Sequence, residues 1–198
     1  MARVPFVGLT GGMGAGKSTA LAALERLGAA TLSTDRVVHE LYEDPEVVGE
    51  VVGRWGEEVA PDGVVDRSRI AAKAFATPEE RGWLEGLLWP RVAARVAAFR
   101  DEALSREPPP AAAIVETPLL FESGMDAGYD ATIAVTAEEA LRSDRAAARG
   151  HHAVDERAAR QLPQAEKAAR ATYAIDNSGS VEELETALSG ILAKLKGS

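Results

Sequence analysis

Thr10-Gly11-Gly12-Met13-Gly14-Ala15-Gly16-Lys17-Ser18-Thr19 decides the fold of this chain, and it directly follows a short apolar run at 4–9. A buried strand, a glycine-rich turn and a helix with a lysine in its first turn form a phosphate-binding loop, whose main-chain N–H groups surround an anion. Lys17 is expected to lie along the β- and γ-phosphates of a triphosphate, and the Ser18 hydroxyl to bind a Mg²⁺ ion between them. The alternative is a glycine-rich turn that merely links a strand to a helix.

The composition indicates one acidic α/β domain with appendages. The chain has 198 residues, 46% of them hydrophobic, which is enough for one core but short for two independent domains. The formal net charge of −9 predicts that nucleic acid is not a partner, because most of the surface repels a polyanion. The sequence contains no cysteine, and we expect no secretory signal, no membrane-spanning segment and a cytoplasmic location.

Five short apolar runs predict five strands, and the helical patterns between them predict a parallel sheet with helices on both faces. The runs lie at 4–9, 29–32, 111–115, 131–135 and 172–175. Helices are expected at 17–27, from a capping box of Thr136 and Glu139 to about 149, and after a capping box of Ser180 and Glu183. The last helix carries an apolar stripe that begins at Val181.

The stretch at 35–110 has no strand-like run of comparable quality, so we predict that it is a helical insertion. Thr77 and Glu80 form a further capping box, and Pro90 is expected to kink or divide the helix that follows. The tryptophans of the chain are expected to form the core of the insertion: Trp55, Trp83 and Trp89. A stacking surface for substrate is the alternative for Trp89.

Two acidic residues follow predicted strands, at the edge where open α/β sheets bind ligands. Asp35 would accept the proton of an acceptor hydroxyl, or alternatively cap a helix that starts at Arg36. Glu116 would hold a magnesium-bound water, or alternatively be solvated at the edge of the sheet. With the loop, these residues supply the parts that phosphoryl transfer needs.

Arg142, Arg145 and Arg149 are spaced at i, i+3 and i+7, so they share one helix face. In an acidic protein such a cluster predicts a lid whose guanidinium groups bind phosphate oxygens. The alternative is a solvated helix in which the arginines pair with nearby carboxylates: Glu138, Glu139 and Asp144. Three histidines match no metal-ligand spacing and are expected at the surface: His39, His151 and His152.

Motifs spread over nearly the whole chain resemble those of the dephospho-CoA kinases. The loop at 8–19, Thr34-Asp35, Asp66-Arg67 and Phe75 are similar to the opening and the insertion of that family. The most diagnostic stretch, Glu116-Thr117-Pro118-Leu119-Leu120-Phe121-Glu122-Ser123-Gly124, resembles the family's (D/E)xPLLFExG motif. The agreement continues in Arg145-x-x-x-Arg149, Arg157-x-x-x-Gln161, Glu166-Lys167 and the stretch at 175–180.

The resemblance implies an enzyme that phosphorylates the ribose 3′-hydroxyl of dephospho-CoA with ATP and Mg²⁺ to give coenzyme A. It implies the α/β three-layer fold of a P-loop kinase, as a single domain over 1–198. The nucleotide-binding core would comprise 1–34, 111–140 and 171–198, with a helical substrate-binding insertion at 35–110 and a lid at 141–170.

The resemblance also implies the roles of individual residues. Asp35 and Lys17 are the expected catalytic residues, and Ser18 and Glu116 are expected to bind Mg²⁺. The nucleotide would be bound by Gly12, Gly14, Ala15, Gly16, Lys17, Ser18, Thr19, Arg145, Arg149 and Asn177. Dephospho-CoA would contact Asp35, Arg67, Phe75, Trp89, Pro118 and Leu119.

Three features depart from the pattern of the family. Ser33 replaces the first Asp of an Asp-Ala-Asp sequence, and Trp89 stands where His usually precedes the proline. The stretch between Arg149 and Arg157 is shorter than typical.

Three other functions compete with this interpretation. A P-loop kinase for a nucleoside monophosphate or shikimate would share the loop but not the PLLFE stretch and the long insertion. A nucleotide-dependent switch usually carries a base-specificity motif such as Asn-Lys-x-Asp, which this chain lacks. A phosphate-binding fold without catalysis would bind ATP, but no acceptor would change its turnover.

Overall fold

The computed structural model describes residues 3–148 and 161–197 of the chain. Contacts divide the chain into two compact units, one of Met1–Ser33 with Arg100–Ser198 and one of Thr34–Phe99. The domain boundaries expected from the sequence stay a prediction.

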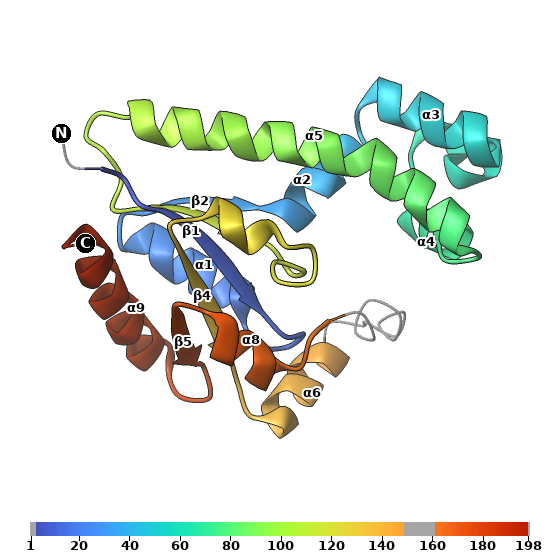
Figure 1. Cartoon of the computed structure of the whole chain (residues 1–198). Coiled ribbons are helices and arrows are strands. Elements are labelled where there is room, and N and C mark those ends of the chain that lie inside the picture. The colour runs from blue at the N-terminus through green and yellow to red at the C-terminus, as the bar shows by residue number, and fades with distance from the viewer. Residues whose placement is uncertain (1–2, 149–160, 198) are drawn as a thin grey trace. The chain divides into compact units, whose positions relative to one another are not determined.

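The first unit contains a five-stranded sheet with the order β2-β3-β1-β4-β5, in which all neighbours are parallel (Figure 1). Its strands are β1 (Phe6–Gly11), β2 (Ala30–Ser33), β3 (Ala113–Glu116), β4 (Ala131–Thr136) and β5 (Tyr173–Asp176). Each strand lies close to its predicted apolar run, so the predicted α/β class with a parallel sheet is confirmed.

One face of the sheet is covered by α1 (Lys17–Arg26) and α9 (Val181–Lys196), which pack against each other. Val7 and Leu9 of β1 are buried in one cluster with Leu24 of α1 and Leu188 of α9. The Ser180 capping box is present as predicted. Val181, however, is 45% exposed, so its place in the apolar stripe was wrong, whereas Leu184 in the same turn is 1% exposed and belongs to the core.

The other face of the sheet receives Phe6, Gly8 and Thr10, since side chains alternate along a strand. The Phe6 ring stacks on Tyr129 with centroids 4.7 Å apart. A short 3₁₀ segment, η3 (Met125–Gly128), precedes that tyrosine, and α8 (Gln164–Arg170) packs on β4 and β1. Helices on both faces are therefore confirmed.

The capping box expected at Thr136 and Glu139 was wrong. Thr136 is the last residue of β4, and its hydroxyl donates to the Ile175 carbonyl oxygen at 3.1 Å, so that hydroxyl serves the sheet instead of a helix. The helix α6 (Glu139–Ala148) begins three residues later.

The second unit is helical, with α2 (Thr34–Leu41), α3 (Pro45–Trp55), α4 (Arg67–Ala74) and most of α5 (Pro78–Ser105). Two 3₁₀ turns, η1 (Glu57–Val59) and η2 (Pro61–Gly63), join α3 to α4. Val51, Val59 and Ile70 form a buried cluster, and Trp55 and Trp83 pack against it. The rings of the two tryptophans contact each other edge to face.

Three details of this unit differ from the sequence predictions. Trp89 is 53% exposed and so does not belong to the core. The Glu80 N–H donates to the Thr77 hydroxyl as a cap requires, but the Glu80 carboxylate binds Arg54 and the Trp55 ring N–H. The helix α5 continues through Pro90, so it is not divided there.

Within residues 3–148 and 161–197, no helix combines the length and the apolar character that a membrane span requires. His39 is exposed, as expected, while His151 and His152 lie outside the described residues.

Candidate active site

The loop between β1 and α1 has the backbone of an anion cradle. Gly14 and Gly16 have φ angles of 71° and 89°, which only glycine adopts readily. A Cβ atom on Gly11 would lie 2.5 Å from the Val135 carbonyl oxygen. These positions exclude side chains, so the main chain itself lines the loop.

The start of α1 presents main-chain N–H groups and the positive end of a helix dipole. Gly16 is the N-cap, no side chain caps the helix, and its first turn has no acidic residue. The Lys17 ammonium group donates to the carbonyl oxygens of Gly11 and Gly12 at 3.2 and 3.4 Å, so it lies over the loop. The Ser18 side chain is exposed in the first turn, as a metal-binding hydroxyl at this place must be.

Residues from α6 and from the segment after β5 donate hydrogen bonds to main-chain carbonyl oxygens of this loop. The Arg142 Nε donates to the Met13 carbonyl oxygen at 2.9 Å, and its Nη1 also pairs with Glu139. Arg145 donates from Nη1 to the Asn177 carbonyl oxygen at 3.2 Å. Arg142 and Arg145, two members of the predicted arginine face, therefore contact the loop or the residue beside it. Arg142 also pairs with Glu139, as the alternative of a solvated helix predicts. Arg149 lies outside the described residues.

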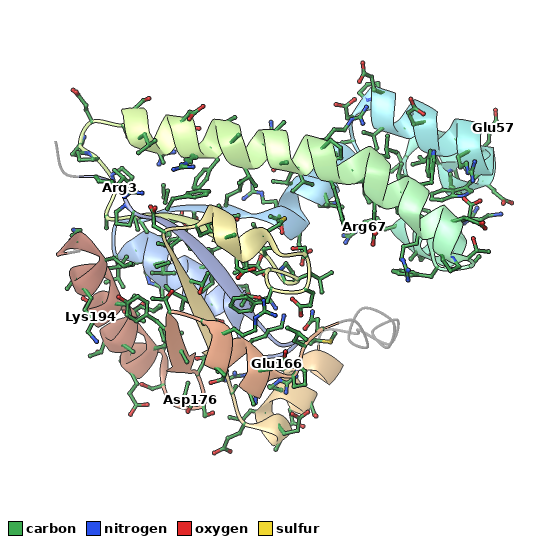
Figure 2. The ribbon with its side chains drawn as sticks, in the orientation of Figure 1. Arg3, Glu57, Arg67, Glu166, Asp176 and Lys194 are labelled. Carbon is green, nitrogen blue, oxygen red and sulfur yellow. The ribbon has the colours of Figure 1, made fainter. Side chains whose placement is uncertain are left out.

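Asn177 was expected to bind the nucleotide, and the structure shows what its side chain contacts. It is 5% exposed, and its amide Nδ2 donates to the Ala15 carbonyl oxygen at 2.9 Å. A Cβ atom on Gly16 would lie 2.0 Å from the same Nδ2. Asn177 follows Asp176, which Figure 2 labels at the end of β5, and it packs directly on the loop.

Glu116 lies at the carboxyl end of β3, opposite Ser33 of β2. The Glu116 side chain is buried, and its Oε2 accepts a hydrogen bond of 2.6 Å from the Ser33 hydroxyl. The alternative of a solvated residue at the sheet edge was therefore wrong. This contact also gives a role to Ser33, which departs from the family pattern: a neutral hydroxyl orients the carboxylate.

The segment after β3 is fixed by hydrogen bonds from Thr10 of β1 and Lys167 of α8. Pro118 and Leu119 are half-buried, and the Pro118 carbonyl oxygen accepts from the Thr10 hydroxyl at 3.3 Å and from the Lys167 ammonium group at 2.5 Å. Lys167 also pairs with Glu122 at 2.9 Å. Glu122 and Lys167 both belong to sequence motifs, but the sequence alone assigns neither of them a role.

Four predicted site residues belong to the second unit. Asp35 is exposed in the first turn of α2, and since that helix begins at Thr34, the alternative of a cap before Arg36 was wrong. Arg67, labelled in Figure 2, is exposed at the start of α4, and Phe75 is the half-buried C-cap residue of that helix. Trp89 is exposed on α5. Their roles stay predictions.

Comparisons with known proteins show which family the chain belongs to. The family model of dephospho-CoA kinases matches residues 5–183. A dephospho-CoA kinase of Deinococcus radiodurans is 38% identical over 193 residues, covering 96% of this chain and 92% of that protein. The crystal structure of TT1252 from Thermus thermophilus has a TM-score of 0.78 at 34% identity, covering 98% of this chain and 99% of that one. A dephospho-CoA kinase from Campylobacter jejuni shares the fold with a TM-score of 0.64 at 20% identity, covering 98% of both chains.

Proposed function

Because the chain belongs to the dephospho-CoA kinase family, we propose that the residues around its glycine loop carry out the reaction of that family. The enzyme catalyses the ATP-dependent phosphorylation of dephospho-CoA to coenzyme A. We assign the ribose 3′-hydroxyl as the acceptor and the residue roles that follow.

The loop binds the phosphates of ATP through main-chain N–H groups, assisted by the dipole of α1. Lys17 neutralises charge on the β- and γ-phosphates, and its contacts with the Gly11 and Gly12 carbonyl oxygens of the loop support this role. Gly12, Gly14, Ala15, Gly16 and Thr19 complete the cradle. Arg145 of α6 and Arg149 add positive charge. Asn177 stabilises the loop through its hydrogen bond to the Ala15 carbonyl oxygen.

The donors at this edge of the sheet fit Mg²⁺, which prefers oxygen ligands and keeps several phosphate or water ligands. The described residues contain no group of three or more His, Cys, Asp or Glu side chains that could hold a metal ion, so a tight all-protein cage is not offered there. We propose that Ser18 binds Mg²⁺ directly and that Glu116 orients a water ligand. When bound, Mg²⁺ neutralises charge that develops on the transferred phosphoryl group.

Asp35 is the proposed base, since it follows the carboxyl end of β2 by two residues and its carboxylate is exposed. It would accept the proton of the ribose hydroxyl as that oxygen attacks the γ-phosphorus and the bond to the β–γ bridging oxygen breaks to release ADP. The remaining contacts with dephospho-CoA are assigned to Arg67, Phe75, Trp89, Pro118 and Leu119. For Trp89, exposure on α5 supports a stacking role. A nucleic-acid partner is not proposed, and a cytoplasmic location stays a prediction.

The observation that carries this proposal is the glycine loop closed against Arg142 and Asn177, with Lys17 at the start of α1. An assay of ADP release with dephospho-CoA, AMP, CMP, shikimate or no acceptor tests it. Turnover should rise with dephospho-CoA alone, and Lys17→Ala should weaken ATP binding and transfer together. Equal turnover with every acceptor, or an intact Lys17→Ala enzyme, would contradict the assignment.

A further inference from the structure

Lys167 is a charged side chain with no exposure to solvent. It lies in α8, next to Glu166, which Figure 2 labels, and its side chain is 0% exposed. Lysine is almost never fully buried unless it is paired, because removing its charge from water is costly. A lysine in this place therefore needs a reason beyond covering the sheet.

The ammonium group of Lys167 in α8 binds the segment after β3, which is distant from it in sequence. It donates to the Pro118 carbonyl oxygen at 2.5 Å and pairs with Glu122 Oε1 at 2.9 Å. The same Oε1 accepts from the Leu162 N–H at 2.7 Å. Glu122 Oε2 is buried without a hydrogen-bond partner among the described residues, so the carboxylate is held in place chiefly through its other oxygen.

The Pro118 carbonyl oxygen is the point where these contacts meet the glycine loop. It also accepts from the hydroxyl of Thr10, a buried residue of β1 one position before Gly11. Two donors, one from β1 and one from α8, thus fix the orientation of the peptide between Pro118 and Leu119. A shift of that peptide would move the half-buried side chains of both residues.

Stability alone does not account for this ion pair. Burial lowers the pKa of the Lys167 ammonium group, although the hydrogen bond and charge of Glu122 act in the opposite direction. Buried ion pairs can often be replaced by apolar residues of similar volume without loss of stability. Because burying this ion pair costs desolvation energy, and because Lys167 also donates to the Pro118 carbonyl oxygen, we infer that the pair serves to hold the backbone at Pro118 in place.

We propose that Lys167 is a positioning residue of the acceptor site: held by Glu122, it fixes the Pro118 carbonyl group and so the 118–119 backbone that contacts dephospho-CoA. The inference rests on the proposed function, because the contact of Pro118 and Leu119 with dephospho-CoA is part of that proposal. Lys167 touches neither nucleotide nor acceptor and acts through the peptide it holds.

The test is the double variant Lys167→Met/Glu122→Leu, which removes both charges and fills the space with apolar side chains. It should fold with a Tm close to that of the parent and bind ATP within about twofold of the parent Kd, because the loop is intact. The kcat/KM for dephospho-CoA should fall about 10- to 100-fold, mostly through KM, since a small displacement of a binding segment has effects of this size. Ser180→Ala, which weakens the cap of α9, is the control: it should lower Tm without changing that KM.

A double variant that folds and keeps the parent KM for dephospho-CoA would overturn the inference. If the double variant does not fold, Thr10→Val decides, because it removes the other donor to the Pro118 carbonyl oxygen at nearly constant volume. Thr10→Val should raise the same KM several-fold with ATP binding unchanged, and an unchanged KM would again overturn the inference. A parent enzyme that does not phosphorylate dephospho-CoA would instead refute the proposed function.

Discussion

Gly16→Ala is expected to damage the phosphate loop through two separable effects. The φ angle of 89° at Gly16 costs a residue with a Cβ atom about 1–2 kcal/mol. The new Cβ would also lie 2.0 Å from Asn177 Nδ2, so the hydrogen bond from that amide to Ala15 must be lost, at about 0.5–1.5 kcal/mol. The sum is about 1.5–3.5 kcal/mol, shared between ATP affinity and stability.

The measurements are the ATP dissociation constant by titration calorimetry and the free energy of unfolding in denaturant. If the loop moves to relieve the strain, the full sum would appear as ATP binding weakened about 10- to 400-fold. If the loop stays, the loss appears as reduced stability. We therefore expect the two losses to add to the calculated range.

The chain offers a matched control at Gly28. Its φ angle is 86°, but a Cβ atom there would meet nothing within 4 Å, so Gly28→Ala reports the backbone strain without the overlap. Asn177→Ala removes the neighbour instead, and in that background Gly16→Ala should cost only about 1–2 kcal/mol. Losses in Gly16→Ala no larger than in Gly28→Ala, or unchanged by Asn177→Ala, would refute the reasoning.

Three further predictions follow from other contacts. Asp35→Asn should keep ATP binding but lower kcat about 10²- to 10⁴-fold in a coupled ADP assay, and transfer within a few-fold of the parent would reject Asp35 as the base. Ser180→Ala should lower the free energy of unfolding by about 1 kcal/mol in denaturant, whereas Ser180→Gly should lower it by only a few tenths; equal losses would speak against the side-chain cap. Burial by itself would raise the pKa of the Glu122 carboxyl, but hydrogen bonds from Lys167 and the Leu162 N–H bring it below its usual value of 4.5. The stability from the ionised carboxylate is thus present above that value and lost as the pH falls through the lowered pKa, so the Tm advantage over Glu122→Gln should vanish in acid; a pH-independent difference in Tm would contradict it.

The elements nearest the glycine loop could be predicted from the sequence because their signals are local. The apolar run, the glycines and Lys17 together determine a strand, a turn and a helix, and all three are present. The cap at Ser180 is also a local pattern and is confirmed. The cap at Thr136 failed because the same spacing arises at the end of a strand, where the threonine hydroxyl serves the neighbouring strand.

The contacts that depend on strand order could not be predicted. Ser33 and Glu116 are 83 positions apart and meet because β2 and β3 are neighbours in the sheet. Lys167 lies in a short helix whose polar sequence predicts exposure to solvent. Its burial follows from the packing of α8 on β4 and β1. The exposure of Trp89 likewise depends on which face of α5 the insertion covers, which hydrophobicity alone does not decide.

The position of β1 in the middle of the sheet has a consequence for biosynthesis. The strand that carries the glycine loop is synthesised before its partners β3 and β4 and before the residue that supports Ala15, all of which follow more than a hundred residues later. Contacts of such long range form late in folding. In a nascent chain the glycine loop is therefore exposed before the contacts that fix its conformation can form. We expect ATP to stabilise the finished enzyme but not its incomplete precursors on the ribosome.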